Sequence, residues 1–350
     1  MRKRIQSPGL SLVFSEDGIK TARNQRNLLS LDIELTKRCN LRCIYCYADA
    51  GVKHKDELRL SEVIHIIDMA RVLGLRTLNL TGGEPLLDKK YFSIAEYANR
   101  RNISMLLFTN GMLITRKVAQ RLMDLKISPC VKLDSLSSAT QDYLASKKGT
   151  LEKIRNGIRN LMDVGYTTTY PVLSVNAVIS QQNLNEIPEL WVWARKHNIV
   201  PSLTRLQPMG RAKGRTDLMV APKEIYELYG KISEIDKGLG ITWEPTIPWV
   251  YGKACKRHYI GCFIDSRGNV QPCSGVPIKA GNIRERGLGE ILSSARIFEV
   301  ARNIENYIEG ACKSCKYKSE CYGCRSIAYC TSGSFTAADP LCWYNRGEAG

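Results

Sequence analysis

The sequence predicts an α/β fold: a partial parallel barrel of six strand-helix units, followed by a small, irregular and cysteine-rich C-terminal domain. Two observations predict it. From about residue 31 to residue 207 the chain repeats a short apolar run, a polar loop and an amphipathic helix. The 13 cysteines fall into two groups, separated by a long stretch that contains only Cys130. Clustered cysteines are typical of metal ligands, whereas a secreted disulfide framework is shorter and more evenly studded.

Six apolar runs in the first part of the chain are short and rich in β-branched residues, as strands are. They cover residues 31–36, 75–81, 103–109, 128–134, 172–179 and 199–207. Between them lie helical stripes of apolar residues, such as Val63, Ile66, Ile67 and Ala70, and Leu151, Ile154, Ile158, Leu161 and Met162. Ser61 is expected to cap the first of these helices. Six units are too few to close an eight-unit barrel, so we expect an open or partial one.

The chain is expected to divide into four regions. These are an N-terminal extension over residues 1–30, the barrel over 31–215, a bridging region over 216–250 and the cysteine-rich domain over 251–346. In parallel α/β folds the active site is built from loops at the carboxyl ends of the strands. We therefore expect the functional residues to follow the strands.

Composition indicates a cytoplasmic globular protein. Of the 350 residues, 44% are apolar and 24% are charged. No apolar run suited to a signal peptide follows the basic N-terminus, and no segment has the length and hydropathy to span a membrane. The formal charge of +17 reflects in part solvated helix faces, and thiolates bound to iron would lower it. Aromatic residues are not interleaved with the basic run near residue 211, so nucleic acid is not an expected partner.

Three cysteines on one short loop carry most of the functional information. Cys39, Cys43 and Cys46 follow the first predicted strand with spacings of three and two residues. Three thiolates can hold three irons of a cubane cluster and leave the fourth iron open to a substrate or cosubstrate. The alternative is a zinc site completed by a distant histidine, although structural zinc normally uses paired two-residue spacings.

A glycine-rich turn follows the second predicted strand. Gly82 and Gly83 would allow the backbone to approach a ligand closely, and the carboxylate of Glu84 could accept hydrogen bonds from an ammonium group. Pro85 completes the segment. A plain strand-to-helix turn is the alternative, and the cysteine loop on the neighbouring strand favours the ligand site.

Together these residues resemble the radical S-adenosylmethionine superfamily. The resemblance rests on Cys39, Cys43 and Cys46, with Tyr45 before the last cysteine, and on the glycine-rich turn that ends at Pro85. It implies a site-differentiated 4Fe-4S cluster whose free iron binds S-adenosylmethionine. It further implies reductive cleavage to a 5′-deoxyadenosyl radical, which removes a hydrogen atom from the substrate, and an external low-potential donor such as flavodoxin or ferredoxin.

Further cosubstrate residues follow from the same resemblance. Thr109 and Asn110, after the third strand, match a turn that lies near the cosubstrate. Lys132 and Asp134 stand where many members have Ser-x-Asp-Gly, so this chain departs from the pattern there. With a period of two, Cys130 shares their face of the strand. Lys132 could pair with a carboxylate of cosubstrate or substrate while Asp134 orients it, and a structural lysine is the alternative.

The C-terminal cysteines are numerous enough for two fully ligated four-iron clusters. A probable hairpin over residues 264–270 lies among them, and paired two-residue spacings alone would also allow zinc. The eight counted as ligands are Cys255, Cys262, Cys273, Cys312, Cys315, Cys321, Cys324 and Cys342. Their pattern resembles the SPASM extension, which carries auxiliary 4Fe-4S clusters. The two-residue gap before Cys324 departs from that pattern, where three residues are common.

Substrate identity is the least defined expectation. Arg205 and Arg211, near the catalytic end of the barrel, could bind an anionic substrate, or they could belong to a solvated connector. The resemblance favours oxidation or cross-linking of a peptide or protein side chain, with modification of an anionic small molecule, such as a tetrapyrrole precursor or aminosugar, as the alternative. Cys130 or Cys330 could donate a hydrogen atom, although buried inert thiols are an alternative for both. An iron-sulfur carrier without chemistry is the alternative of another class, and we expect a monomer.

Overall fold

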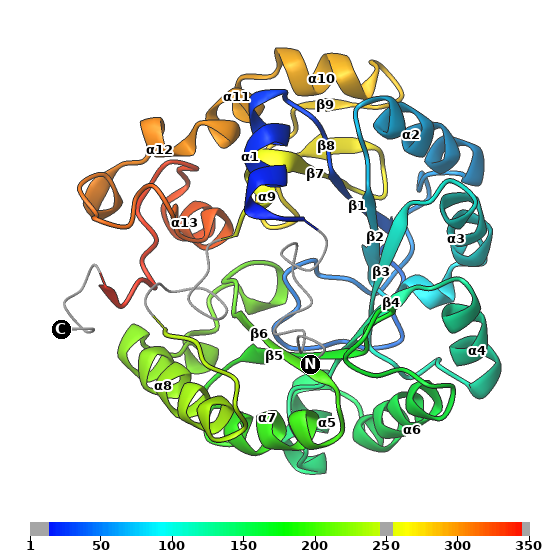
Figure 1. Cartoon of the computed structure of the whole chain (residues 1–350), viewed down its shortest axis with the longest axis vertical. Coiled ribbons are helices and arrows are strands. Elements are labelled where there is room, and N and C mark those ends of the chain that lie inside the picture. The colour runs from blue at the N-terminus through cyan, green and yellow to red at the C-terminus, as the bar shows by residue number, and fades with distance from the viewer. Residues whose placement is uncertain (1–13, 246–254, 345–350) are drawn as a thin grey trace.

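The computed structural model describes residues 14–245 and 255–344, and it contains one curved sheet with helices around its outer side (Figure 1). The strand order is β6-β5-β4-β3-β2-β1-β7-β8-β9. The strands are β1 (Ser30–Thr36), β2 (Thr77–Gly82), β3 (Ser104–Thr109), β4 (Ser128–Lys132), β5 (Ser174–Ile179), β6 (Val200–Arg205), β7 (Gly261–Ile264), β8 (Asn269–Gln271) and β9 (Gly281–Asn282).

The six predicted barrel strands are all present, and β1 to β6 pair in parallel in sequence order. The predicted α/β partial barrel is therefore confirmed. Several strand ends differ from prediction by two residues, and one of them is at β4, which ends at Lys132 rather than at residue 134. Asp134 thus belongs to the loop that follows the strand, where its side chain can turn back toward Lys132.

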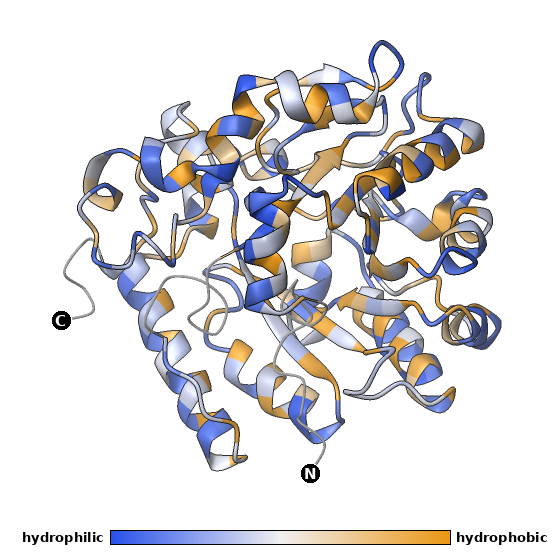
Figure 2. Ribbon diagram, turned by 45° about the horizontal axis from the view of Figure 1, so that its top comes forward, coloured by the Kyte–Doolittle hydropathy of each residue, from blue (hydrophilic) through white to orange (hydrophobic). Residues whose placement is uncertain are grey.

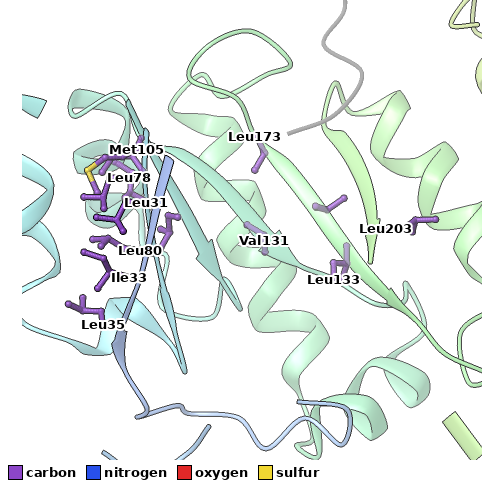
Figure 3. Close-up of a cluster of buried hydrophobic side chains, with 14 of the residues drawn as sticks. Leu31, Ile33, Leu35, Leu78, Leu80, Met105, Val131, Leu133, Leu173 and Leu203 are labelled. Atoms are coloured by element: carbon purple, nitrogen blue, oxygen red, sulfur yellow. The ribbon is translucent and has the colours of Figure 1, made fainter. Parts of the chain in front are cut away.

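Helices such as α2 to α8 cover the outer face of the sheet and bury its apolar side, and several short helices belong to the C-terminal region. The helices are α1 (Glu16–Asn24), α2 (Leu60–Val72), α3 (Tyr91–Asn99), α4 (Arg116–Asp124), α5 (Ser138–Ala145), α6 (Thr150–Asp163), α7 (Ile187–Lys196), α8 (Pro222–Gly238), α9 (Arg257–Ile260), α10 (Leu288–Ser294), α11 (Arg296–Arg302), α12 (Ile304–Tyr307) and α13 (Arg325–Ser332). Their apolar faces turn toward the sheet (Figure 2). In Figure 3, strand residues such as Leu31, Leu80 and Val131 form the inner layer of this core.

The predicted helix stripes are buried, and one cap differs from prediction. Val63 and Ile66 of α2 and Ile154 of α6 are at most 1% exposed. The helix α2 begins at Leu60, with Arg59 as its N-cap, because the Glu62 carboxylate accepts a hydrogen bond from the Arg59 backbone N–H at 2.8 Å. The predicted cap at Ser61 was therefore wrong by two residues.

The C-terminal region continues the same sheet. Strand β7 pairs in parallel with β1, and β8 and β9 add antiparallel strands at that edge. The predicted hairpin is present, with Ile264 opposite Val270. The remainder consists of short helices and irregular segments, and Trp343 packs its ring against Tyr226 and Tyr229 of α8.

The predicted region boundaries stay predictions. Parts of the N-terminal extension, bridging region and C-terminal domain lie outside the described residues, at 1–13, 246–254 and 345–350. The β1 and β7 pairing shows that the sheet itself crosses from the barrel into the C-terminal region. Among the described helices, none combines the length and apolar character that a bilayer crossing requires.

Candidate functional site

A cavity of 1390 Å³ lies at the carboxyl ends of the barrel strands and extends to the C-terminal region. Its wall includes Cys39, Cys43 and Cys46 from the loop after β1. The same wall includes three cysteines from the distant C-terminal group, Cys255, Cys273 and Cys324. The fold therefore brings the two cysteine groups to one shared space.

The cysteine loop is held in place by backbone contacts. The Leu41 N–H donates to the Cys39 sulfur at 3.4 Å, and the Ile44 N–H donates to the Leu144 carbonyl at 3.0 Å. The Cys39 N–H donates to the Gly51 carbonyl at 3.2 Å. These bonds fix the loop independently of any metal.

The segment after β6 supports this loop from the other side. The Arg211 guanidinium donates to the Cys43 carbonyl at 2.8 Å, and the Arg211 backbone N–H donates to the Cys46 carbonyl at 3.0 Å. Arg211 also pairs with Asp49 at 2.8 Å. Arg211 lines the cavity, but its guanidinium is engaged by the loop, and substrate binding by it stays a prediction.

Gly210 is a supporting residue that the sequence reasoning missed. Its φ is +57°, and a Cβ atom there would lie 2.4 Å from the carbonyl oxygens of Cys46 and Tyr47. Only glycine fits such a close approach to the loop without displacement. A glycine in the loop after β6, next to the predicted basic residue Arg211, was the available signal.

The thiols of the loop share one electrostatic environment. Burial raises the pKa of Cys39, and burial raises that of Cys43 to about 12, with the charges of Asp134 and Cys46 adding to it. A cationic iron core would stabilise the thiolates that this environment disfavours, so the donor set fits an iron-sulfur cluster. Within the described ranges, no three Cys, His, Asp or Glu side chains are placed so that they could bind one metal ion together. A cubane cluster does not require this, because each of its cysteines binds a different iron.

Gly82 and Gly83 line the cavity as expected. A Cβ atom on Gly82, whose φ is +146°, would lie 2.4 Å from the Thr36 carbonyl oxygen. On Gly83 it would lie 2.2 Å from the Arg38 carbonyl oxygen. The two glycines therefore allow the turn after β2 to pack directly against the cysteine loop.

Glu84 lies behind the cavity wall, fully buried. Its carboxylate accepts hydrogen bonds from the Thr109 hydroxyl at 2.8 Å, the Asn110 N–H at 2.7 Å and the Leu86 N–H at 3.2 Å. Burial nevertheless raises its pKa to about 7. Glu84 thus joins the ends of β2 and β3, while Pro85 starts a short 3₁₀ helix. The expected bond from Glu84 to an ammonium group stays a prediction.

Thr109 and Asn110 line the cavity, and Asn110 also contacts the cysteine loop. Its side-chain amide donates to the Asn40 side chain at 2.7 Å. The neighbouring Phe108, on the inward face of β3, is 38% exposed and also lines the cavity. The sequence reasoning missed Phe108, although alternation along the strand could have indicated an inward-facing position.

Lys132, Asp134 and Tyr45 form a buried cluster beside the cysteine loop. Lys132 forms an ion pair with Asp134, and the Tyr45 hydroxyl donates to the same carboxylate. Lys132 also donates to the Asn176 carbonyl at 3.2 Å, and its ammonium lies 5.1 Å from the Tyr45 ring centroid. Lys132 and Tyr45 line the cavity, and Asp134 holds them from behind. An ammonium has three N–H donors, so Lys132 retains one beyond these two partners.

The two candidate hydrogen-atom donors lie in different places. Cys130 is buried on β4 and lines the cavity. Cys330, on α13, contacts the Met209 sulfur at 3.3 Å and is not among the residues of the cavity wall. The geometry therefore favours Cys130 over Cys330 for a reaction inside the cavity, and both roles stay predictions.

The C-terminal cysteines lie in a buried environment. Burial raises the pKa of Cys255 to about 12, with the charges of Cys273 and Cys324 adding to it. Burial raises the pKa of Cys321 to about 11, with the charge of Cys342 adding to it. The Cys315 N–H donates to the Cys312 carbonyl at 3.4 Å. Which of these cysteines bind which cluster stays undivided, and their role as ligands stays a prediction.

Arg205 connects the barrel to these cysteines. It pairs with Asp339 at 2.7 Å, and both side chains are at most 3% exposed. Asp339 also accepts the Cys324 N–H at 2.8 Å and the Leu341 N–H at 2.9 Å. Arg205 lines the cavity, but its charge is matched by Asp339, which the sequence reasoning did not single out. Substrate binding by Arg205 stays a prediction.

Basic side chains outnumber acidic ones in the cavity wall. The basic residues are Lys20, Arg23, Lys132, Arg205, Arg211, Lys256, Arg257 and Arg325, and the acidic ones are Glu16, Asp32, Glu244 and Glu320. Several of these cations already have protein partners, such as Asp32 for Arg257 and Glu305 for Arg23. The balance nevertheless favours a ligand with negative charge.

Comparisons with known proteins agree with this site. The chain matches a family model described as the radical SAM superfamily over residues 33–191, and SPASM, described as an iron-sulfur cluster-binding domain, over residues 255–316. It is 29% identical over 341 residues to the AdoMet-dependent heme synthase of Methanosarcina barkeri, covering 90% of this chain and 96% of that relative. It is 27% identical over 345 residues to the PqqA peptide cyclase of Rhizobium meliloti, covering 92% and 90%.

A solved structure shares the fold. The crystal structure of Streptococcus suis SuiB bound to S-adenosylmethionine superposes with a TM-score of 0.72 at 19% sequence identity. The match covers 95% of this chain and 84% of that one.

Proposed function

Because this chain is a radical SAM enzyme with a C-terminal SPASM domain, we propose that it oxidises or cross-links a side chain of a peptide or protein that binds in the shared cavity. Its cofactors are S-adenosylmethionine, a 4Fe-4S cluster and auxiliary iron-sulfur clusters. The single observation that carries the proposal is that one cavity is lined by cysteines of both groups.

The residues of the barrel loop fit the catalytic cluster. Cys39, Cys43 and Cys46 would hold it, and when bound it supplies the electron that cleaves S-adenosylmethionine to a 5′-deoxyadenosyl radical. The chain itself positions the reactants: Gly82 and Gly83 allow close backbone approach, and Thr109 and Asn110 form the adjoining wall.

The C-terminal cysteines favour a net oxidation. Removal of a hydrogen atom takes one electron and one proton from the substrate, and a two-electron oxidation requires an acceptor for a second electron. Auxiliary clusters held by Cys255, Cys273 and Cys324, in the wall of the same cavity, supply an acceptor of this kind when bound. An electron carrier without chemistry would not need the cosubstrate wall that surrounds the barrel loop.

A peptide substrate is supported by the similarity to the PqqA peptide cyclase over nine tenths of both chains. The cavity also exceeds the usual size of a small-molecule pocket, at 1390 Å³. A chain segment could therefore enter it together with the cosubstrate.

A second candidate is radical modification of an anionic small molecule, such as decarboxylation of a tetrapyrrole precursor. Two observations favour it: the similarity to the AdoMet-dependent heme synthase and the excess of basic residues in the cavity wall. Lys132, with one N–H donor left, would pair with a carboxylate of such a substrate.

The test is an anaerobic assay of the reconstituted enzyme with dithionite and S-adenosylmethionine, with the Cys39→Ala variant as the control. We expect 5′-deoxyadenosine in the wild type and only the background level in the variant. Peptides encoded beside the gene and a propionate-bearing porphyrin are then supplied separately. Loss of two hydrogens from a peptide supports the first candidate, and loss of carbon dioxide from the porphyrin supports the second. Absence of 5′-deoxyadenosine with every substrate would contradict both.

The same proposal includes the partners. We infer that a low-potential donor of the flavodoxin or ferredoxin type reduces the barrel cluster, and that the enzyme acts as a monomer in the cytoplasm. Equal turnover with reduced flavodoxin and with dithionite, and a monomeric mass by light scattering, are the expected results.

A further inference from the structure

The cysteine loop after β1 has an outer face as well as the face that lines the cavity. Cys39, Leu41 and Cys43 belong to the cavity wall, whereas Arg38 and Arg42, which alternate with them along the chain, do not. Both arginines are exposed. The loop therefore presents its cysteines to the cavity and two cations to the outside of the molecule.

The turn after α5 lies against this outer face and adds two more cations. The Arg42 backbone N–H donates to the Ala145 carbonyl at the end of α5, at 3.4 Å. The exposed Lys147 ammonium donates to the Asn40 carbonyl of the loop at 3.2 Å, and the next residue, Lys148, is also exposed. We call these four cations the outer basic patch: Arg38, Arg42, Lys147 and Lys148.

The charge of the outer basic patch is not matched within the chain. Among the residues that the structure describes, no carboxylate forms an ion pair with any of its four cations. The neighbouring carboxylates have other partners: Asp49 pairs with Arg211 at 2.8 Å, and Asp142 accepts three backbone N–H groups at the start of α6. Glu152, in the first turn of α6, is exposed and offsets one charge at most. The patch thus keeps a net positive charge.

An exposed apolar side chain borders the same patch. Val52 is 72% exposed and follows Gly51, on which the Arg42 guanidinium packs so closely that a Cβ atom there would lie 0.9 Å from its Nη1. The same nitrogen donates to the Ala50 carbonyl at 3.1 Å, so Arg42 is held on the loop surface. Arginine beside an apolar group is typical of surfaces that bind another protein.

We propose that the outer basic patch docks an acidic protein that delivers one electron to the barrel cluster. The inference rests on the barrel cluster and the protein electron donor of the proposed function, and it assigns the surface on this chain that receives the donor. The inner face of the loop lines a cavity of 1390 Å³, which is too small to admit a folded protein. A protein donor can therefore approach the cysteine loop only from its outer side.

The chemistry of this step is a single electron transfer. The donor protein is oxidised by one electron and the barrel cluster is reduced by one, while no bond forms or breaks. The patch contributes by attraction, because a positive surface next to the cluster loop raises the rate at which an acidic protein associates there. Such a rate falls as salt is added, because the patch is exposed to solvent.

The experiment measures 5′-deoxyadenosine formed by the anaerobically reconstituted full chain with S-adenosylmethionine and a limiting amount of reduced flavodoxin. The test variant combines Arg38→Glu with Lys148→Glu, because neither side chain forms a hydrogen bond within the described part of the chain and the loop contacts are kept. Its rate should fall by about tenfold, since electrostatic steering accounts for an effect of at least this order. The wild-type rate should fall in the same way as salt is raised from about 0.05 M to about 0.5 M.

Two controls separate docking from other effects. Arg100→Glu with Lys126→Glu changes the net charge equally, but these exposed residues precede β3 and β4 and so lie at the opposite end of the barrel. This variant should keep the wild-type rate with flavodoxin. Reduced methyl viologen, a small cation that needs no docking surface, should give equal rates with the wild type and with both variants.

Several outcomes would overturn the proposal. These are an equal loss in the two charge-reversal variants, a flavodoxin rate that does not change with salt, and turnover with methyl viologen but none with flavodoxin. A loss with methyl viologen in the patch variant would do the same, because the patch would then support the loop itself. If the wild type forms no 5′-deoxyadenosine with either donor, the proposed function fails and the docking surface fails with it. Turnover with methyl viologen together with an unaffected patch variant contradicts the docking surface alone.

Discussion

The two cysteine regions of this molecule are held by different means. The barrel loop extends from the end of a strand in a regular parallel sheet, and glycines at positions 82, 83 and 210 let backbone pack directly on it. Apart from Cys262 on β7, the C-terminal cysteines lie on short helices and irregular segments, where a buried ion pair from Arg205 to Asp339 adds to the β1 and β7 pairing as an attachment. Strand register therefore positions the first site, and side-chain electrostatics position the second.

The supporting cores differ in the same way. The core between the sheet and the outer helices is continuous along the whole barrel. The C-terminal core is smaller, includes Cys312, and has Cys255 and Cys273 packed against it. Where so few apolar groups are available, metal binding contributes much of the folding free energy. The C-terminal region should thus depend on its clusters more than the barrel does.

The largest expected effect breaks the attachment of the C-terminal region. Asp339→Asn leaves the Arg205 guanidinium buried without its counter-charge, and breaking a buried pair costs about 3–5 kcal/mol. Urea unfolding followed by tryptophan fluorescence should show this loss, because Trp343 is fully buried near Asp339 in the sequence.

The control for this prediction removes both charges. The double variant Arg205→Met with Asp339→Asn should recover at least half of the lost free energy of unfolding, since an apolar group replaces the buried guanidinium and the amide oxygen still accepts a backbone N–H. If Asp339→Asn alone unfolds at the wild-type urea concentration, the pair does not attach the C-terminal region.

A smaller effect is expected from the barrel side. In Gly210→Ala the new methyl group would meet the carbonyl oxygens of Cys46 and Tyr47 at 2.4 Å, so the loop must move. Together with the strain of an alanine in the left-handed backbone conformation, this contact should lower the free energy of unfolding by about 2–3 kcal/mol. The barrel cluster should be lost in part, while the auxiliary clusters are retained, as measured by iron content and electron paramagnetic resonance.

Gly214→Ala is the matched control. Gly214 has a φ of +77° but no atom within 4 Å of an added Cβ. The Gly214→Ala variant should therefore lose only about 1 kcal/mol of unfolding free energy, from backbone strain, and should keep its full cluster content. Equal cluster loss in the two alanine variants would show that contact with the loop is not the reason for glycine at position 210.

Prediction from sequence succeeded where periodicity carries the information. Alternating apolar runs and helical stripes located six strands, and the end of the first strand located the cysteine loop. Spacing alone singled out Cys39, Cys43 and Cys46, because they lie on one short loop whose grouping does not depend on distant structure, and all three line the cavity. A period of two placed Cys130 and Lys132 on one face of β4, and the structure shows that this face lines the cavity.

Prediction failed where long-range packing decides. Counting cysteines placed Cys262 among the ligands, which stays a prediction, but the count gave no sign that Cys262 lies in the apolar core on a strand that joins the barrel sheet. That β7 would pair with β1 is not visible in either segment by itself. The partner of Arg205 was likewise hidden, because Asp339 lies more than a hundred residues further along the chain. The predicted cap at Ser61 failed for a local reason, since the helix begins two residues earlier, with Arg59 as its N-cap and the Glu62 carboxylate on the Arg59 backbone N–H.

The smallest effect concerns a second, exposed link between the two regions. Glu62 of α2 pairs with Arg284, after β9, at 2.6 Å, and the side chain of Arg284 is 36% exposed. The Arg284 hydrogen bond lowers the Glu62 pKa to about 2, so its contribution to stability is present above the usual carboxyl pKa and is lost as pH falls toward 2. Solvent screening limits that contribution to about 0.5–1 kcal/mol.

Glu62→Gln should therefore lower the free energy of unfolding by this amount at pH 7, by less at pH 4, and by almost nothing in about 1 M salt. The control Glu290→Gln breaks the exposed Arg286 pair inside the C-terminal region, at 3.6 Å, and should cost less because no second region is held by it. An equal loss in both variants, or a loss that persists in high salt, would show that the exposed pair does not add to the buried link between the regions.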